Sequence, residues 1–321
     1  MVFVMVVIGG ITRLTHSGLS ITEWNPIAGA LPPLGDADWQ AAFLHYQATP
    51  QYRLENAGMT LAEFKAIYGW DYVHRLWGRL IGVVFLVPFL YFLARGRIAR
   101  PLVPRLALLF VLGGLQGGLG WFMVESGLAE RTAVSQYRLA AHLAAALLIY
   151  GYMLWLALDL LAPPASATAR EGFGRARLFA AWVALVALSG AFVAGLHAGL
   201  IYNSFPLMDG RLVPAGLFGA TPWYASPFED VTTAQFDHRV LALLTVAAAV
   251  FFRLSLRGVA LTPRARRAAN LVVAMVLVQL GLGIATLVLV VPIPLAACHQ
   301  AGALLLFSFA LWTAHELKGA G

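Results

Sequence analysis

The stretches AAHLAAALL (residues 140–148) and ACHQAGALL (residues 297–305) decide the fold that this sequence predicts. Each places one histidine, His142 or His299, early in an apolar segment of membrane-spanning length. A histidine at the edge of the hydrocarbon is costly unless it faces the interior of a helix bundle and has a partner there. The matched stretches therefore predict a duplicated helix bundle with inward-facing histidines.

Each half of the chain supplies a second histidine where another apolar segment begins. His74 lies in the sequence DYVHR and His238 in the sequence FDHR. Both histidines of a half enter from the same membrane face at similar depth, so they can hold one iron between two helices. Neutral imidazole is the usual protein ligand of haem iron, and bundles carry such ligands on facing helices. We predict two bis-histidine metal centres, most simply two haems, at His74 with His142 and at His238 with His299.

The composition is that of an integral membrane protein. Of the 321 residues, 60% are hydrophobic and 12% are charged, whereas soluble domains carry about 25% charged residues. Most apolar segments approach the ~20 residues that cross a bilayer core. The first is short, so either its true start lies upstream of Met1 or this helix is incomplete, and it lacks the basic region and cleavage site of a signal peptide. We predict eight all-α transmembrane segments, at residues 1–14, 72–94, 105–124, 138–161, 176–196, 237–256, 268–291 and 295–314.

The charges in the loops predict the orientation. Arginines gather in alternate loops, at residues 95–105, 170–177 and 253–267, and the other loops are mixed or acidic. The positive-inside rule places the arginine-rich loops and both termini in the cytoplasm, and the four histidines near the periplasmic side. The net charge of +7 comes from these loops, so the expected partner is the lipid bilayer and not nucleic acid.

Two further windows repeat between the halves. GGITRLTHSGL at residues 9–19 matches GAFVAGLHAGL at 190–200, and LQGGLG at 115–120 matches VQLGLG at 278–283. Their glycines allow close helix packing or leave room for a flat macrocycle. We predict two pseudo-symmetric four-helix bundles related by an axis along the membrane normal, with domains at residues 1–162 and 176–321 and a cytoplasmic linker at 163–175.

Long outer loops precede the second helix of each half. In the first, Thr60 and Glu63 form a capping box, which predicts a helix that ends near Gly69. We expect this loop and the second-half loop at residues 197–236 to cover the outer sites.

The acidic residue Asp71 distinguishes the two centres. It lies three residues before His74, so on a helix the two share a face, whereas Gln235 takes this position before His238. A carboxylate there would orient the imidazole, act as a base near a bound substrate or stabilise positive charge, unless it only lies in interfacial water. We predict chemistry at the first centre and electron transfer at the second.

Other polar residues suggest further roles. Arginine pairs with haem propionates in bidentate fashion, although interfacial snorkelling would also explain arginines at this depth. The single cysteine, Cys298, rules out a disulfide within the chain, and the missing CxxCH motif rules out covalent haem attachment. His45 and His315 are predicted to lie on the surface. The arginines near the predicted centres are Arg75, Arg79, Arg138 and Arg239.

Taken together, the motifs resemble those of the haem A synthase family, in the longer type of proteobacteria and mitochondria. The resemblance covers nearly the whole chain, through GGITRLTHSGLSITEW, MTLAEFKAIYGWDYVHRLWGRLIG, QGGLGWFMVESGL, VSQYRLAAHL, LSGAFVAGLHAGLIYNSFPLM, QFDHR and PLAACHQ. It implies an oxidoreductase that converts the C8 methyl of haem O to a formyl group by successive hydroxylations. The product, haem A, serves terminal oxidases, so the resemblance implies a role in cytochrome oxidase assembly at the cell inner membrane.

The resemblance also implies roles for the histidine pairs. His238 and His299 would hold a resident haem b, and His74 and His142 the substrate haem O. The family typically has Glu where this chain has Asp71. The expected partners are a ferredoxin-like or membrane reductant and haem O synthase, and a homo-oligomer stays open.

Two other functions use some of the same features. A di-haem b-type cytochrome would carry electrons on the same four histidines and leave both haems unmodified. A transporter built from two repeats would have sites near the bilayer midplane, whereas the polar residues here gather near the outer face. The sequence favours the haem A synthase over both.

Overall fold

The described chain is helical and divides into two compact units. The computed structural model describes residues 1–25, 27–130, 132–161 and 172–318, and no β-strand occurs in them. The units are residues 1–149 and 150–321, so the boundary falls inside helix α6 (Gln136–Leu161). Most of the predicted cytoplasmic linker, at residues 163–171, lies outside the described residues.

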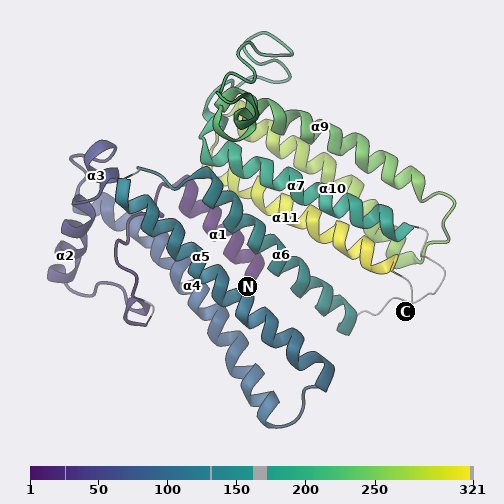
Figure 1. The fold of residues 1–321 in the computed structure, drawn as a ribbon, viewed down its shortest axis with the longest axis horizontal. Coiled ribbons are helices and arrows are strands. Elements are labelled where there is room, and N and C mark those ends of the chain that lie inside the picture. The colour runs from purple at the N-terminus through teal and green to yellow at the C-terminus, as the bar shows by residue number, and fades with distance from the viewer. Residues whose placement is uncertain (26, 131, 162–171, 319–321) are drawn as a thin grey trace. The chain divides into compact units, whose positions relative to one another are not determined.

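All eight predicted segments are helical, and among the described residues seven helices are long and apolar enough to cross a membrane (Figure 1). The chain is thus a multi-pass membrane protein. Helix α1 (Val2–Leu14) has 13 residues, or about 20 Å at 1.5 Å per residue, which is short of the ~30 Å hydrocarbon core. The eighth span therefore stays a prediction. One of the seven is α6. The other six are α4 (Leu61–Ala94), α5 (Val103–Glu130), α7 (Phe173–Gly195), α9 (Val231–Ser255), α10 (Pro263–Val288) and α11 (Ile293–Glu316).

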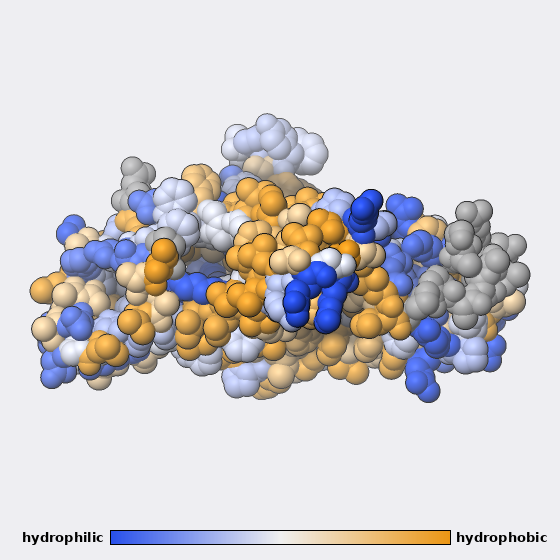
Figure 2. All heavy atoms as spheres, turned by 90° about the horizontal axis from the view of Figure 1, so that it is seen from below, coloured by the Kyte–Doolittle hydropathy of each residue, from blue (hydrophilic) through white to orange (hydrophobic). Residues whose placement is uncertain are grey.

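Large apolar side chains cover the outside of these helices. Leu115 on α5, Leu178 on α7 and Phe251 on α9 are exposed by 63%, 73% and 71%. Figure 2 shows broad apolar areas on the visible face, with the polar groups in separate patches. Apolar surface of this extent marks a contact surface, here for lipid, because lipid tails solvate leucine as well as another helix does.

In the first unit, a small aromatic cluster supports the start of α4. Helices α2 (Asp36–Gln47) and α3 (Pro50–Leu54) lie in the long loop between α1 and α4, and Phe43 and Tyr46 of α2 pack against Phe64 of α4. The capping box begins α4 as predicted, with the Thr60 N–H donating to Glu63 Oε2 at 2.8 Å. The predicted end near Gly69 is wrong: α4 continues to Ala94, because one glycine inside a helix costs only about 1 kcal/mol.

In the second unit, α7, α9, α10 and α11 contact one another in a ring: α7 with α9, α9 with α10, α10 with α11, and α11 with α7. Small side chains such as Ala268 and Ala269 of α10 are fully buried, which lets the helices approach closely. In the first unit, α4 contacts α1 and α5. The pseudo-symmetric pair of bundles stays a prediction.

Candidate functional site

The second unit brings His238 of α9 and His299 of α11 together. Their ring centroids are 6.5 Å apart and their planes are perpendicular, at 89°. An imidazole nitrogen lies about 2 Å from a bound metal, and the ring centre about 1 Å further, so two rings on one metal have centroids about 6 to 6.5 Å apart. The observed spacing fits one metal between the two rings.

The hydrogen bonds of Ser189 on α7 fix the tautomer of His238. Ser189 Oγ donates to the carbonyl oxygen of Val186 at 2.8 Å, and it also lies 2.8 Å from His238 Nδ1. Because the hydroxyl proton is already used, Ser189 accepts from Nδ1–H. This assignment, made from the hydrogen-bond network, leaves the lone pair of His238 Nε2 available for a metal.

The first unit contains the corresponding pair, His74 of α4 and His142 of α6. The two imidazoles lie within electrostatic range of each other. All four histidines are partly buried. The described residues contain no group of three or more histidine, cysteine or acidic side chains able to hold a metal. Pairs of imidazoles suit a metal that brings its own equatorial ligands, as haem iron does.

Each of the four imidazoles packs against a glycine of a neighbouring helix. A methyl group built on these glycines would lie only 2.9–3.3 Å from the nearest ring atom, closer than the about 3.5–4.0 Å of an ordinary carbon contact. The glycines lie in the sequence windows that repeat between the two halves, so both halves have the same glycine–histidine contacts. The pairs are Gly9–His74, Gly120–His142, Gly190–His238 and Gly283–His299.

Two glutamines that the sequence analysis missed also contact the histidine helices. Gln116 Nε2 of α5 donates to the carbonyl oxygen of His142 at 2.9 Å. Gln279 Nε2 of α10 donates to the carbonyl oxygen of His299 at 2.8 Å. The signal was present in the repeat, because LQGGLG and VQLGLG carry glutamine at the same place.

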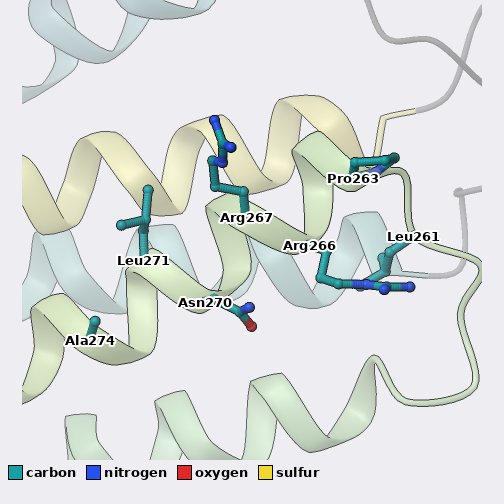
Figure 3. Close-up of a pocket in the computed structure, with 7 residues that line it drawn as sticks. All are labelled: Leu261, Pro263, Arg266, Arg267, Asn270, Leu271 and Ala274. Atoms are coloured by element: carbon teal, nitrogen blue, oxygen red, sulfur yellow. The ribbon is translucent and has the colours of Figure 1, made fainter.

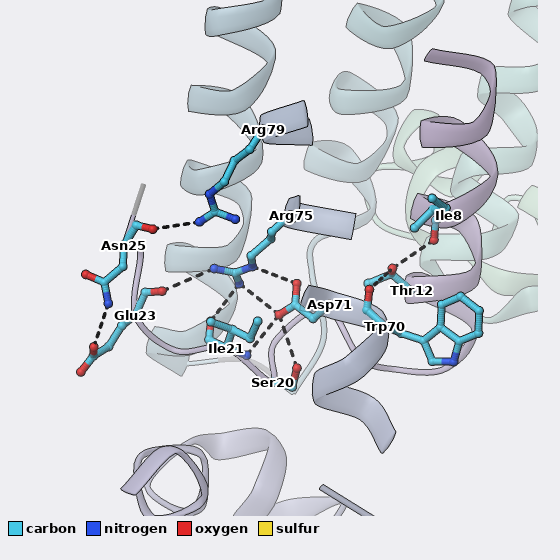
Figure 4. A network of polar contacts seen from close by, with 10 residues as sticks. All are labelled: Ile8, Thr12, Ser20, Ile21, Glu23, Asn25, Trp70, Asp71, Arg75 and Arg79. Atoms are coloured by element: carbon cyan, nitrogen blue, oxygen red, sulfur yellow. Dashed lines mark hydrogen bonds and ion pairs between the residues drawn. The ribbon is translucent and has the colours of Figure 1, made fainter. Parts of the chain in front are cut away.

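Asp71 is committed to an ion pair that holds the outer loop (Figure 4). Its side chain is 3% exposed, and its Oδ1 accepts from Arg75 Nε at 2.9 Å. Its Oδ2 accepts from the N–H of Ile21 at 3.1 Å and from the hydroxyl of Ser20 at 3.4 Å. Arg75 Nη2 in turn donates to the Ile21 carbonyl at 2.8 Å. The pair thus fastens the chain after α1 to the outer part of α4.

The second unit repeats this clamp without the acid. Arg239 donates to the carbonyl oxygens of Tyr202 and Ser204 and to Gln235 Oε1. Gln235 donates to the carbonyl oxygens of Ala198 and Ile201. A neutral amide therefore replaces the carboxylate at the matching position.

The predicted propionate-binding arginines differ in what they contact. Arg75 and Arg239 both bind loop carbonyls as described, whereas the Arg138 guanidinium lies over the Phe122 ring, 4.6 Å from its centroid. The fourth, Arg79, donates to the carbonyl oxygen of Asn25 at 2.8 Å. Haem binding by these four arginines stays a prediction.

His315 was predicted to lie on the surface, and this is wrong. The residue is fully buried, and its Nε2 lies 3.0 Å from Asp159 Oδ1 on α6. A buried polar side chain needs such a partner, and here the partner is far away in sequence. His45 is exposed, as predicted.

A pocket at the start of α10 lies far from the glycine that packs against His299. It is lined by Leu261, Pro263, Arg266, Arg267, Asn270, Leu271 and Ala274, and in Figure 3 Arg266 and Arg267 point to different sides of the helix. Arg267 and Gly283 are about 24 Å apart along α10 at 1.5 Å per residue. The pocket is therefore not part of the His238–His299 centre.

Comparisons with known proteins show the family to which the chain belongs. Residues 1–311 match the COX15-CtaA family, described as cytochrome oxidase assembly protein. The chain is 52% identical to a haem A synthase of Nitrosospira multiformis and 54% identical to one of Paramagnetospirillum magneticum, in each case over 99% of this chain and 90% of the relative. It is 46% identical to the haem A synthase COX15 of Bos taurus, over 98% of this chain and 78% of the relative. No solved structure matches.

Proposed function

Because this chain belongs to the cytochrome oxidase assembly protein family and is a haem A synthase, we propose that its two units hold haem for different purposes. The enzyme is an oxidoreductase that converts haem O to haem A. His238 and His299 hold a resident haem b, and His74 and His142 hold the substrate haem O while its C8 methyl is oxidised in successive hydroxylations.

The observation that carries this division is the difference between Ser189 and Ile8. Ser189, just before Gly190, locks the proton of His238 on Nδ1. The matching position before Gly9 is Ile8, whose side chain cannot form a hydrogen bond. A hydrogen bond from the imidazole nitrogen that does not bind the metal orients the ring and typically raises metal affinity by about 10- to 100-fold. A locked ligand suits a haem that stays, and an unlocked one suits a substrate that must leave as product.

A haem between His238 and His299 supplies one-electron transfer when bound. The perpendicular imidazoles and their 6.5 Å spacing support this centre. His238 of α9 and His299 of α11 are the residues that would hold the haem, and the His238 tautomer would leave Nε2 free to bind its iron. The glycines Gly190 and Gly283 let both rings lie close to the neighbouring helices.

Asp71 acts in this proposal as a charged positioning residue beside the substrate. Its two oxygens already accept bonds from Arg75, Ile21 and Ser20, so it is a poor proton acceptor. Its negative charge lies one helical turn from His74 and stabilises positive charge that develops nearby. The clamp also holds the outer loop over this end of α4. Of the roles predicted for Asp71, electrostatic stabilisation thus has the best support.

The remaining assignments follow from the same division. Arg75, Arg138 and Arg239 are the proposed neighbours of the haem propionates. Both termini lie in the cytoplasm and both haem sites lie near the periplasmic side of the inner membrane. Electrons pass to or from a ferredoxin-like or membrane partner, and haem O arrives from haem O synthase.

The test is chromatography of haems extracted from cells that supply haem O, reductant and oxygen. We expect His74→Ala and His142→Ala to abolish haem A while the purified protein keeps haem b. We expect His238→Ala and His299→Ala to remove haem b from the purified protein. If the first pair of variants lost haem b and the second pair kept it, the assignment of the two units would be reversed.

A further inference from the structure

We propose that Gln116 and Gln279 are positioning residues of the two haem centres, each aiming one histidine through that histidine's backbone carbonyl. The proposal rests on the function proposed above and adds the device that orients His142 and His299. The side-chain amide of each glutamine bonds to the backbone of the histidine and not to its ring, so each amide acts through the helix that carries the ring.

The two contacts are equivalent in geometry. Gln116 reaches the His142 carbonyl at 2.9 Å and Gln279 reaches the His299 carbonyl at 2.8 Å. Each glutamine lies one helical turn before the glycine that packs against the same histidine, Gly120 or Gly283. One face of α5 or α10 therefore holds a histidine at two points, its backbone and its ring.

The histidines concerned lack the usual anchor on the ring itself. Metal-bound imidazoles normally donate their second N–H to a protein acceptor, as His238 does to Ser189. The Nδ1 atoms of His142 and His299 are buried and have no hydrogen-bond partner among the described residues. The rotation of the His142 ring is then left to the glycine contact and to the glutamine bond on the backbone, and the His299 ring also lies beside the backbone of Gln279.

Each glutamine also buries a polar oxygen, which costs free energy that an apolar side chain at the same position would not cost. The Oε1 atoms of Gln116 and Gln279 are both buried without a partner among the described residues. A helix carbonyl already accepts from its own helix and needs no second donor. The same incomplete amide at both matching positions is hard to explain by packing, because methionine would fill the space without an unpaired oxygen.

The packing on α11 makes room for this amide. Gly302 follows His299 by three residues and is buried, and a methyl group at Gly302 would collide with Gln279 Oε1. Gln279 is therefore confined between the His299 carbonyl and the Gly302 backbone. Ligand geometry must be held to about 0.5 Å and 10–20° in a working site, and such a wedge limits rotation of α11 at that scale.

The perpendicular rings provide a spectroscopic readout. In a ferric low-spin haem held by two imidazoles, the angle between the two ring planes would determine the splitting of the iron d orbitals and with it the largest g value. Perpendicular planes, as for His238 and His299, give the most anisotropic spectrum. A helix that turns about its axis changes this angle, whereas a change in overall stability does not.

The experiment compares Gln279→Met with Gln116→Met in the full-length, haem-loaded protein. Gln279→Met keeps the length of the side chain and removes the donor. We expect the largest g value of the resident haem to fall and transfer of that haem to excess apomyoglobin to become about fivefold faster, as for loss of one hydrogen bond. Gln116→Met should leave the resident haem unchanged and shift the spectrum of haem O added to the first centre.

Two further variants complete the test. Gln279→Asn keeps the amide but is too short to reach the carbonyl, so it should shift the spectrum as Gln279→Met does. Val278→Met, at a position 53% exposed on the same helix, should change nothing. An unchanged g value and haem transfer rate in both Gln279 variants would overturn the inference, and so would equal effects of the two methionine variants on one haem. Retention of haem b by His238→Ala and His299→Ala would instead overturn the function proposed for the second unit.

Discussion

Adding one methyl group at Gly283 tests the close packing of the His299 ring. In Gly283→Ala the new carbon would lie 2.9 Å from His299 Cε1. An ordinary carbon contact is about 3.5–4.0 Å, so the ring or the helix must move by about 0.6–1 Å. The distance between a metal and its ligand atom can vary by only about 0.2 Å in a working metal site. We therefore expect Gly283→Ala to weaken binding of the resident haem.

The size of the effect follows from the cost of overpacking. An extra methyl in a filled core typically costs about 1–3 kcal/mol, which corresponds to about 5- to 140-fold in haem affinity at 1.4 kcal/mol per tenfold. Alanine also favours the helix over glycine by about 1 kcal/mol. That gain stabilises the fold with or without haem, so it does not restore the haem site.

The neighbouring glycine supplies a matched control. A methyl group on Gly281 would meet nothing within 4 Å, although it lies only two residues away on α10. The assay is haem b per purified protein, with haem transfer to apomyoglobin as the rate measurement. We expect Gly281→Ala to match the unaltered protein. Equal haem content and equal transfer rates in Gly281→Ala and Gly283→Ala would refute the role given to the glycine–histidine contact.

Three other perturbations have defined outcomes. Gly120→Ala should reduce haem A formation by at least about fivefold, because its methyl would lie 3.2 Å from His142 Cε1. The control Gly117→Ala places its methyl in open space and should leave haem A formation unchanged. Haem A is measured by chromatography of extracted haems, and equal yields from the two variants would count against the contact. Ser189→Ala removes the acceptor of His238 Nδ1–H and should weaken resident haem binding about tenfold. Ser189→Thr keeps the hydroxyl and serves as the control. Haem affinity is measured by titration, and equal affinities of the two variants would contradict the tautomer assignment. Asp71→Asn keeps the shape but loses the charge that pairs with Arg75, so haem A formation should fall while haem b content stays unchanged; a parallel loss of haem b would show that the clamp supports the whole fold instead.

Much of this protein could be predicted because its signals are local. Apolar runs of membrane-spanning length, the capping box at Thr60 and the loop arginines each depend on neighbouring residues only. The histidine pairs could be found because the chain is duplicated, and the duplication marks positions whose roles one copy alone would not reveal.

Other features were missed or misjudged because they depend on contacts between distant segments. His315 reads as a surface residue until Asp159, on another helix, is placed beside its ring. Asp71 reads as a group free to act on a substrate until Arg75 and the Ile21 backbone occupy its oxygens. Gln116 and Gln279 read as ordinary residues of the repeat until the facing carbonyls are known.

The sequence by itself determined a duplicated, all-helical membrane protein with two pairs of histidines, because hydropathy, spacing and repetition are properties of the linear chain. Only the tertiary structure decided that His238 and His299 stand perpendicular at 6.5 Å, that each imidazole rests on a glycine, and that Ser189 but not Ile8 orients a ring. Those facts depend on which helix faces meet and at what depth, and helix packing, not composition, sets both.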